Sequence, residues 1–116
     1  MTTREAIVAA LGTVGGLSPS GTKTGPISPG DAWPVWRATR WANAVPDGVR
    51  LATWDVLVAL PDGGSDVTTA EGDPLVEAVG AALIAAGLQI DLVEPARTAV
   101  TENSPGTPVL RYQVHD

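Results

Sequence analysis

The segment from residue 33 to residue 60 alternates with a period of two, and this feature constrains the fold more than any other. Successive side chains of a strand point to opposite faces. In the first half of the segment one face carries Val35, Arg37, Thr39 and Trp41, and the other carries Trp36, Ala38, Arg40 and Ala42. The tetrapeptide VPDG at 45–48 is typical of a type I turn with a glycine bulge. The sequence therefore predicts a long β-hairpin over 34–60.

The second half of this hairpin is apolar on both faces. One face carries Trp54, Val56, Val58 and Leu60, and the other carries Leu51, Leu57 and Ala59. A strand of this kind is normally central in its sheet and covered on both sides. We therefore expect it in the middle of the sheet.

Two helices are predicted, one on each side of the hairpin in the chain. Thr2 followed by Glu5 fits a capping box, and the apolar residues that follow recur at helical spacing, which predicts a helix over about 3–12. Asp73 as N-cap and Pro74 at the first helical position predict a second helix, which Gly87 ends.

The remaining segments are interpreted as loops and strands. Residues 15–31 are rich in glycine and proline and predict a long flexible loop, and residues 60–72 predict a polar loop. Residues 88–95 predict a third strand that Pro95 interrupts, and residues 96–114 predict a terminal β-hairpin. The order α-β-β-α-β-β indicates a single α+β domain over residues 1–116, with a mainly antiparallel sheet and helices packed on it.

Composition restricts the chemistry of this chain. Its 116 residues include no cysteine and one histidine, His115, which excludes disulfides, thiolate nucleophiles, zinc–thiolate sites and a histidine metal cluster. The net charge of −6 disfavours adhesion to a phosphate backbone. No apolar run approaches the roughly 20 residues that span a bilayer, and the first residues do not read as a secretory signal.

The stretch GLSPSGTKTG at 16–25 is superficially similar to a phosphate-binding loop. In such a loop lysine directly follows the second glycine, whereas Thr22 separates Gly21 from Lys23. A phosphate-binding loop also leads from a strand into a helix N-terminus, whereas this stretch follows a predicted helix and runs into the pairs Gly25-Pro26 and Pro29-Gly30, which are not expected to open a helix. We therefore predict no nucleotide site here, and we expect this loop to become ordered against a partner.

The ionisable residues suggest structure rather than catalysis. Asp55, within an apolar strand, is either a general base or one half of a structural ion pair with Arg37 or Arg40. We favour the ion pair, because pairing about the turn brings residue 55 near residues 38 and 39. The acids at 62, 66, 71 and 73 lack the spacing of a calcium-binding EF-hand and predict a solvated loop. No nucleophile elbow or closely paired acids are present, so we expect no enzyme, catalytic residue, metal or cofactor.

Four tryptophans, Trp33, Trp36, Trp41 and Trp54, are the most informative group. On a regular strand Trp36 points opposite to Trp33 and Trp41. Either all four belong to the core, or at least one lies in a protein interface, where tryptophan is enriched. The candidates for contact with another subunit or a tube are Trp33, Trp36, Trp41, Lys23, Arg97 and Tyr112.

The order of these segments resembles that of tail terminator proteins of long-tailed, siphovirus-type bacteriophages, especially those of actinobacterial hosts. Two motifs contribute to the likeness, W-x-V-x-V-x-L-P at 54–61 and V-E-P-A at 93–96, and it covers most of the chain. The resemblance implies a ring, expected to be hexameric, that caps the tail tube, ends tail polymerisation and joins the tail to the head.

The partners implied by this resemblance are other copies of the chain, the tail tube protein and a neck or head-completion protein. The location implied is the virion, after assembly in the host cytoplasm, with DNA passing through the lumen without specific binding and with no membrane contact. Head–tail connectors and head-closure subunits of the phage neck share the pattern and are an alternative. A different alternative is an α+β module that binds a peptide or ligand at a sheet edge.

Overall fold

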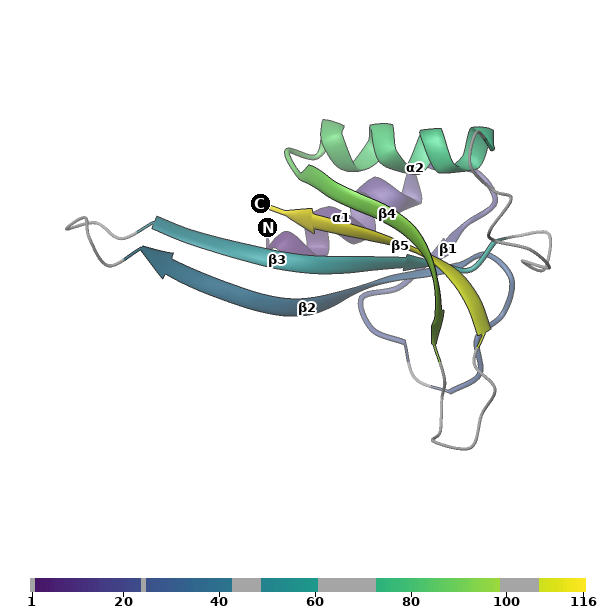
Figure 1. Ribbon diagram of the computed structural model, residues 1–116. Helices are drawn as coiled ribbons and strands as arrows, with labels where there is room; N and C mark the ends of the chain where they lie inside the picture. The colour runs from purple at the N-terminus through teal and green to yellow at the C-terminus, as the bar shows by residue number, and fades with distance from the viewer. Residues whose placement is uncertain (1, 24, 43–48, 61–72, 99–106) are drawn as a thin grey trace.

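The computed structural model describes residues 2–23, 25–42, 49–60, 73–98 and 107–116, which form one α+β domain. In chain order its elements are α1 (Thr3–Gly12), β1 (Ser18–Pro19), β2 (Asp31–Ala42), β3 (Val49–Val58), α2 (Pro74–Ala85), β4 (Gln89–Thr98) and β5 (Thr107–His115). Figure 1 shows both helices on one side of the sheet. The predicted fold class and both helices are confirmed, and β2 and β3 are the predicted hairpin.

Both helices begin where the sequence predicts, because the side chain before each one caps it. Thr2 Oγ1 accepts a hydrogen bond from the backbone N–H of Glu5, and Asp73 Oδ1 accepts one from Leu75 at 2.8 Å. After α2 the chain turns at Gly87, whose φ of 92° lies in the region that favours glycine. Local capping chemistry therefore sets the helix bounds.

The strands form a mixed sheet in the order β1-β2-β3-β5-β4. Among the described strands β1 lies parallel to β2, and the other neighbours are antiparallel. β3 is central, as expected. β1 lies within the stretch 15–31 that was predicted as a structureless loop. Ser18 N–H donates to Gly30 O at 2.8 Å and Ser20 N–H to Ala32 O at 2.9 Å, so backbone hydrogen bonds tie this stretch to β2.

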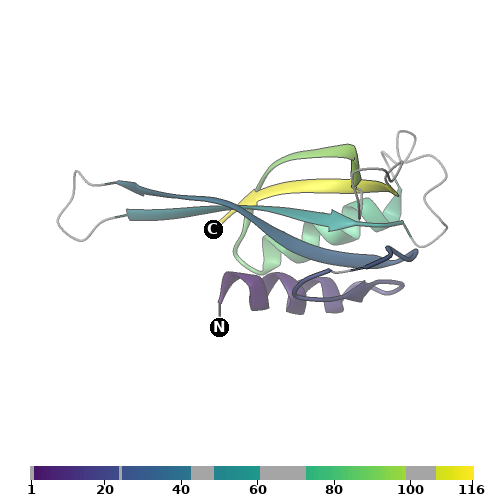
Figure 2. The same cartoon turned by 90° about the horizontal axis from the view of Figure 1, so that it is seen from below.

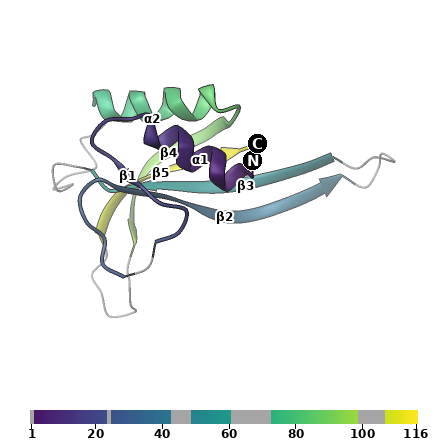
Figure 3. The ribbon, with the colours of Figure 1, turned by 180° about the vertical axis from the view of Figure 1, so that it is seen from behind.

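The main core lies between the two helices and one face of the sheet (Figure 3). It includes Ile7 and Leu11 from α1, Val79 and Leu83 from α2, and Trp54, Val56, Tyr112 and Val114 from the sheet. On the opposite face Trp33, Ala59 and Val109 form a small second cluster. Neither helix lies on that second face, which we call the open face. On this face of β3 Leu51 is exposed, whereas Asp55 is buried and Leu57 packs against the small cluster, so the expectation that β3 is covered on both sides holds only toward its C-terminal end.

A β-bulge in β2 changes which side chains share a face. The register of β2 against β3 shifts between Trp36 and Ala38, so Arg37 is an extra residue in the ladder. Such a bulge displaces the alternation by one position for all residues that follow. Trp41 consequently lies on the same face as Trp36, on the side of the helices. The expected opposite orientation of these two tryptophans is wrong.

β4 runs without interruption through Pro95 to Thr98. The predicted break at Pro95 and a hairpin that begins at residue 96 are therefore wrong. β4 is an edge strand that pairs only with β5. A proline is tolerated on an edge strand because the side that faces away from the neighbouring strand needs no ladder hydrogen bond. The terminal hairpin consists of the whole of β4 and β5.

β2 and β3 project beyond the rest of the sheet as a two-stranded arm. β5 pairs with β3 only over 53–58, whereas β2 pairs with β3 as far as Ala42 and Val49. Figures 1 and 2 show this pair of strands extending past both helices. We call residues 37–42 and 49–52 the β-arm.

Candidate interaction site

Two of the predicted interface residues, Trp33 and Tyr112, lie inside the fold. The Tyr112 hydroxyl donates to the carbonyl oxygen of Val76 at 3.0 Å. Burial raises the pKa of the Tyr112 phenol, and the carboxylates of Glu77 and Asp73 raise it further. Both aromatic residues therefore stabilise the domain and are not available at the surface for a partner.

Lys23 ties the Gly/Pro-rich stretch to the start of β2. Its ammonium lies 2.9 Å from Asp31 Oδ2, an oxygen that also accepts the backbone N–H of Ser28 at 2.8 Å. The hydrogen bond from Ser28 and the contact with Lys23 lower the pKa of Asp31. Arg4 adds a hydrogen bond to the carbonyl of Gly21. Lys23 therefore has a structural contact, and the stretch contains β1 and leads into β2 rather than into a helix N-terminus.

Asp55 forms an ion pair with Arg37 on the open face. Arg37 Nη1 lies 3.0 Å from Asp55 Oδ2. Asp55 is 5% exposed and the Arg37 side chain 51% exposed, and Asp55 Oδ1 is buried without a partner in the described part of the chain. The register of β2 against β3 places Asp55 opposite Val35, not near residues 38 and 39 as expected. Arg40 lies farther along the β-arm, opposite Leu51.

The open face carries apolar side chains near this ion pair. Val35 on β2, Leu51 on β3 and Leu92 on β4 are all exposed large hydrophobic residues. Val35 pairs with Asp55, Leu51 with Arg40, and Leu92 with Gln113, which itself pairs with Asp55. These pairings place all three apolar side chains on the open face. Arg97 is exposed near the end of β4.

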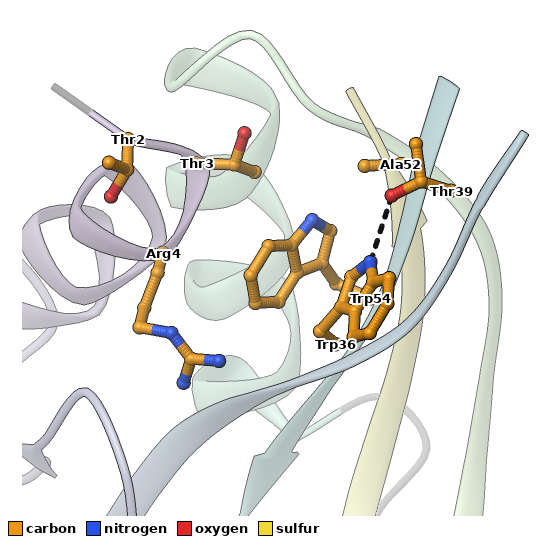
Figure 4. Close-up of a pocket in the computed structure, with 7 residues that line it drawn as sticks. All are labelled: Thr2, Thr3, Arg4, Trp36, Thr39, Ala52 and Trp54. Carbon is orange, nitrogen blue, oxygen red and sulfur yellow. Dashed lines mark hydrogen bonds between the residues drawn. The ribbon is translucent and has the colours of Figure 1, made fainter. Parts of the chain in front are cut away.

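On the helix side of the sheet, Trp36 at the base of the β-arm and Trp41 on the arm are 55% and 61% exposed. At the base of the arm a pocket of about 650 Å³ opens beside the start of α1. We call it the indole pocket. Its lining comprises Thr2, Thr3, Arg4, Trp36, Thr39, Ala52 and Trp54 (Figure 4). Three elements that are distant in sequence, namely α1, β2 and β3, therefore build one cavity.

Hydrogen bonding within the indole pocket is incomplete. Trp36 Nε1 donates to Thr39 Oγ1 at 3.0 Å, and the Arg4 guanidinium lies 5.1 Å from the centre of the Trp54 ring, within the range of a cation–π contact. Trp54 Nε1, by contrast, is buried and has no hydrogen-bond partner among the described residues. The seven lining residues include no carboxylate, imidazole or amine that could act as a base.

The sequence drew attention to Trp36 and Trp54, but not to Arg4 or the three threonines of the pocket. Arg4 is the only cation before Lys23, which is the one signal that could have identified it. The threonines gave no signal, because only the packing of α1 against the base of the β-arm brings them together.

Comparison with protein-family models found no match, and comparison with curated protein sequences found no significant relative. Within the described ranges no group of three His, Cys, Asp or Glu side chains is placed to hold a metal ion. No helix in those ranges is long and apolar enough to cross a membrane. Of the acids considered for calcium, Asp73 caps α2, and those at 62, 66 and 71 lie outside the described residues.

Proposed function

We propose that this chain is a non-catalytic structural subunit of a siphovirus-type phage tail. In this proposal copies of the chain form a ring, expected to be hexameric, that caps the tail tube, stops its polymerisation and joins it to the head or neck. The observation that carries the proposal is the projecting β-arm, with Trp41 exposed on its helix side and Trp36 exposed on the same side at its base. The resemblance in element order supplies the identity of the assembly.

The β-arm suits contact with a neighbouring subunit. Complete burial of a tryptophan removes about 150–250 Å² of surface, and Trp36 and Trp41 are each more than half exposed. Covering both removes on the order of 200 Å², worth about 5 kcal/mol at about 25 cal/mol per Å². This gain is comparable to the lower end of the cost of association, about 4 kcal/mol, so these two side chains are strong candidates for interface anchors.

The surfaces of this domain also suit a ring geometrically. A closed ring uses a heterologous interface, in which two different patches meet on every pair of neighbours. The helix side of the β-arm and the apolar open face around Val35, Leu51 and Leu92 are two such patches. They lie on opposite sides of the sheet, so one subunit can contact a neighbour with each.

The acidic charge of the chain fits passage of DNA without adhesion. Six copies of a chain with net charge −6 carry a formal charge of −36. Negative charge repels phosphate backbones and disfavours tight, sequence-independent binding. DNA that binds the purified ring tightly at moderate salt would count against this part of the proposal.

The test uses the tail tube protein of the same phage. Purified tube protein polymerises alone or with this chain, and tube lengths are measured by electron microscopy. We expect short, capped tubes with a ring at one end. Trp41→Ala should lengthen the tubes again, whereas Ile84→Ala, which removes an equally exposed apolar side chain from α2, should not. Tubes of unlimited length in the presence of the unaltered chain would refute the proposal.

The alternative within the phage neck is a connector or head-closure subunit. The same tube-length experiment distinguishes it from a tail terminator. A connector or head-closure subunit binds head or neck particles and leaves tube length unchanged. The α+β binding module is separated by mass in solution, because it stays at 11.9 kDa at high concentration and caps no tube.

A further inference from the structure

We propose that the indole pocket binds a proline-containing, extended segment of another protein. This inference does not rest on the proposed ring, because any partner that presents such a segment would fill the same site. It starts from Trp54, whose side chain lies at the bottom of the pocket and is 8% exposed.

The indole nitrogen of Trp54 is an unused hydrogen-bond donor. Trp54 Nε1 is buried and has no partner in the described part of the chain. Figure 4 shows this nitrogen on the side of the ring that faces Thr3 and Ala52. Buried donors without partners are rare and costly in folded proteins. An acceptor atom that reaches this nitrogen from outside removes that cost, so the pocket selects a ligand that carries an acceptor.

The other polar groups of the pocket are partly engaged within the chain. Thr39 Oγ1 already accepts the Trp36 N–H, so its own hydrogen can point outward. The Thr3 hydroxyl donates to Asp116 Oδ2 at 3.2 Å. Arg4 is held by the carbonyl oxygens of Gly21 and Pro34 and has no acceptor group. Thr39 therefore adds a second donor to that of Trp54, whereas Thr3, whose hydrogen is used by Asp116, offers only lone pairs.

Charge around the pocket disfavours an anion as the ligand. The Thr2 hydroxyl donates to Glu5 Oε1, and the Thr3 hydroxyl donates to Asp116 Oδ2, so a carboxylate lies beside each of these two threonines of the pocket lining. An anionic ligand would meet both carboxylates. The acceptor is therefore best supplied by a neutral carbonyl.

A proline-containing segment meets these requirements together. Each proline offers a carbonyl acceptor, lacks a backbone N–H and presents a flat apolar ring. Such segments adopt the polyproline II helix, lose little entropy on binding and dock in grooves lined by aromatic side chains. Trp36, which is 55% exposed beside Trp54, provides the aromatic wall, and Trp54 Nε1 and Thr39 provide the donors.

The test is an NMR titration of the full ¹⁵N-labelled chain with decaproline. The chain has four tryptophans, so the indole N–H signals are few, and Trp54→Phe assigns the one of interest. We expect a saturable shift of the Trp54 indole signal at peptide concentrations of about 1 mM or below. Loss of the single hydrogen bond in Trp54→Phe should weaken binding by about 2- to 10-fold, as followed through the Trp36 indole signal.

Two exposed tryptophans provide the matched variants. Trp36→Ala removes the aromatic wall of the pocket and should weaken decaproline binding by about 10-fold or more. Trp41→Ala, on the same strand and face but outside the pocket lining, should leave it unchanged within about 2-fold. Because Trp36 is largely exposed, this variant keeps its fold, which circular dichroism verifies, even if Trp54→Phe does not fold.

Four results would overturn the proposal. The first is a Trp54 indole signal that stays unchanged at the highest decaproline concentration. The second is a Gly-Ser decapeptide that shifts this signal as strongly as decaproline does. The third is the same shift produced by acetate alone, which would make the pocket an anion site. The fourth is an oligomer of the chain alone, detected by sedimentation, that decaproline dissociates, which would assign the pocket to a second copy.

Discussion

Removal of the Arg37 side chain tests how the open face is stabilised. Arg37 Nη1 lies 3.0 Å from Oδ2 of Asp55, which is only 5% exposed. In Arg37→Ala the buried carboxylate loses its ion-pair partner, while its second oxygen has no partner among the described residues. We expect this variant to be clearly less stable than the unaltered chain.

The exposures of the two partners bracket the magnitude. Breaking a fully buried pair costs about 3–5 kcal/mol, whereas an exposed pair contributes about 0–1 kcal/mol. The carboxylate here is buried but the Arg37 side chain is 51% exposed, so solvent screens the pair and we expect about 1–3 kcal/mol. For a chain of 116 residues the unfolding entropy near the midpoint converts this into a Tm decrease of about 4–12 °C.

The assay is thermal unfolding by differential scanning calorimetry, with Arg40→Ala as the matched control. Arg40 is on the same strand, is exposed and lies opposite Leu51, so its loss should change stability by less than about 0.5 kcal/mol. Adding Asp55→Asn to Arg37→Ala should recover part of the loss, since no buried charge is then left alone. Equal Tm values for Arg37→Ala and Arg40→Ala would show that the reasoning is wrong.

Three further predictions concern local structure. Gly30→Ala should destabilise the fold strongly in urea unfolding, because φ of Gly30 is 90° and a Cβ there would lie 2.8 Å from the carbonyl oxygen of Gly16. Gly25→Ala is the control: φ of Gly25 is 78° but the space around it is open, so this variant should cost only about 1 kcal/mol. The pKa of Asp31 is lowered, so the stability that its carboxylate contributes is present above the ordinary pKa of 3.8 and is lost as the pH falls below it. Asp31→Asn should therefore flatten the acid side of a plot of unfolding free energy against pH. An unchanged slope would contradict this. Asp73→Ala removes the cap of α2 and should cost about 1 kcal/mol by calorimetry, while an unchanged Tm would mean that the cap contributes nothing.

Features that depend on neighbours in sequence were predictable. Thr2 and Asp73 cap α1 and α2 as expected, because capping joins a side chain to a backbone N–H two or three residues away. The pairing of β2 with β3 follows from strand periodicity, whereas the turn predicted at 45–48 lies outside the described residues. The Asp55 ion pair was predicted with two candidate partners, since a diagonal reach across a hairpin depends on a register that the sequence leaves open.

Features that depend on the order of strands and the packing of layers were not predictable. Pro95 lies within β4 only because that strand is at the edge, and nothing near residue 95 in the chain reveals the position of its strand in the sheet. The bulge at Arg37 depends on how β2 pairs with β3. It places Trp41 on the same face as Trp36, although the alternation of polar and apolar residues in the sequence gives no sign of it. The stretch 15–31 contains β1 because its backbone pairs with the edge of β2.

The sequence by itself determined the helices, the hairpin, the α+β class and the lack of thiol and histidine-cluster chemistry, because each depends on composition or on contacts between close neighbours. Tertiary structure alone decided that two of the candidate aromatics are buried, that one sheet face is open, and that α1 meets the base of the β-arm. The indole pocket belongs to this second group. Its donor on Trp54 lacks a partner only because distant elements enclose it, and burial of that kind arises when layers pack.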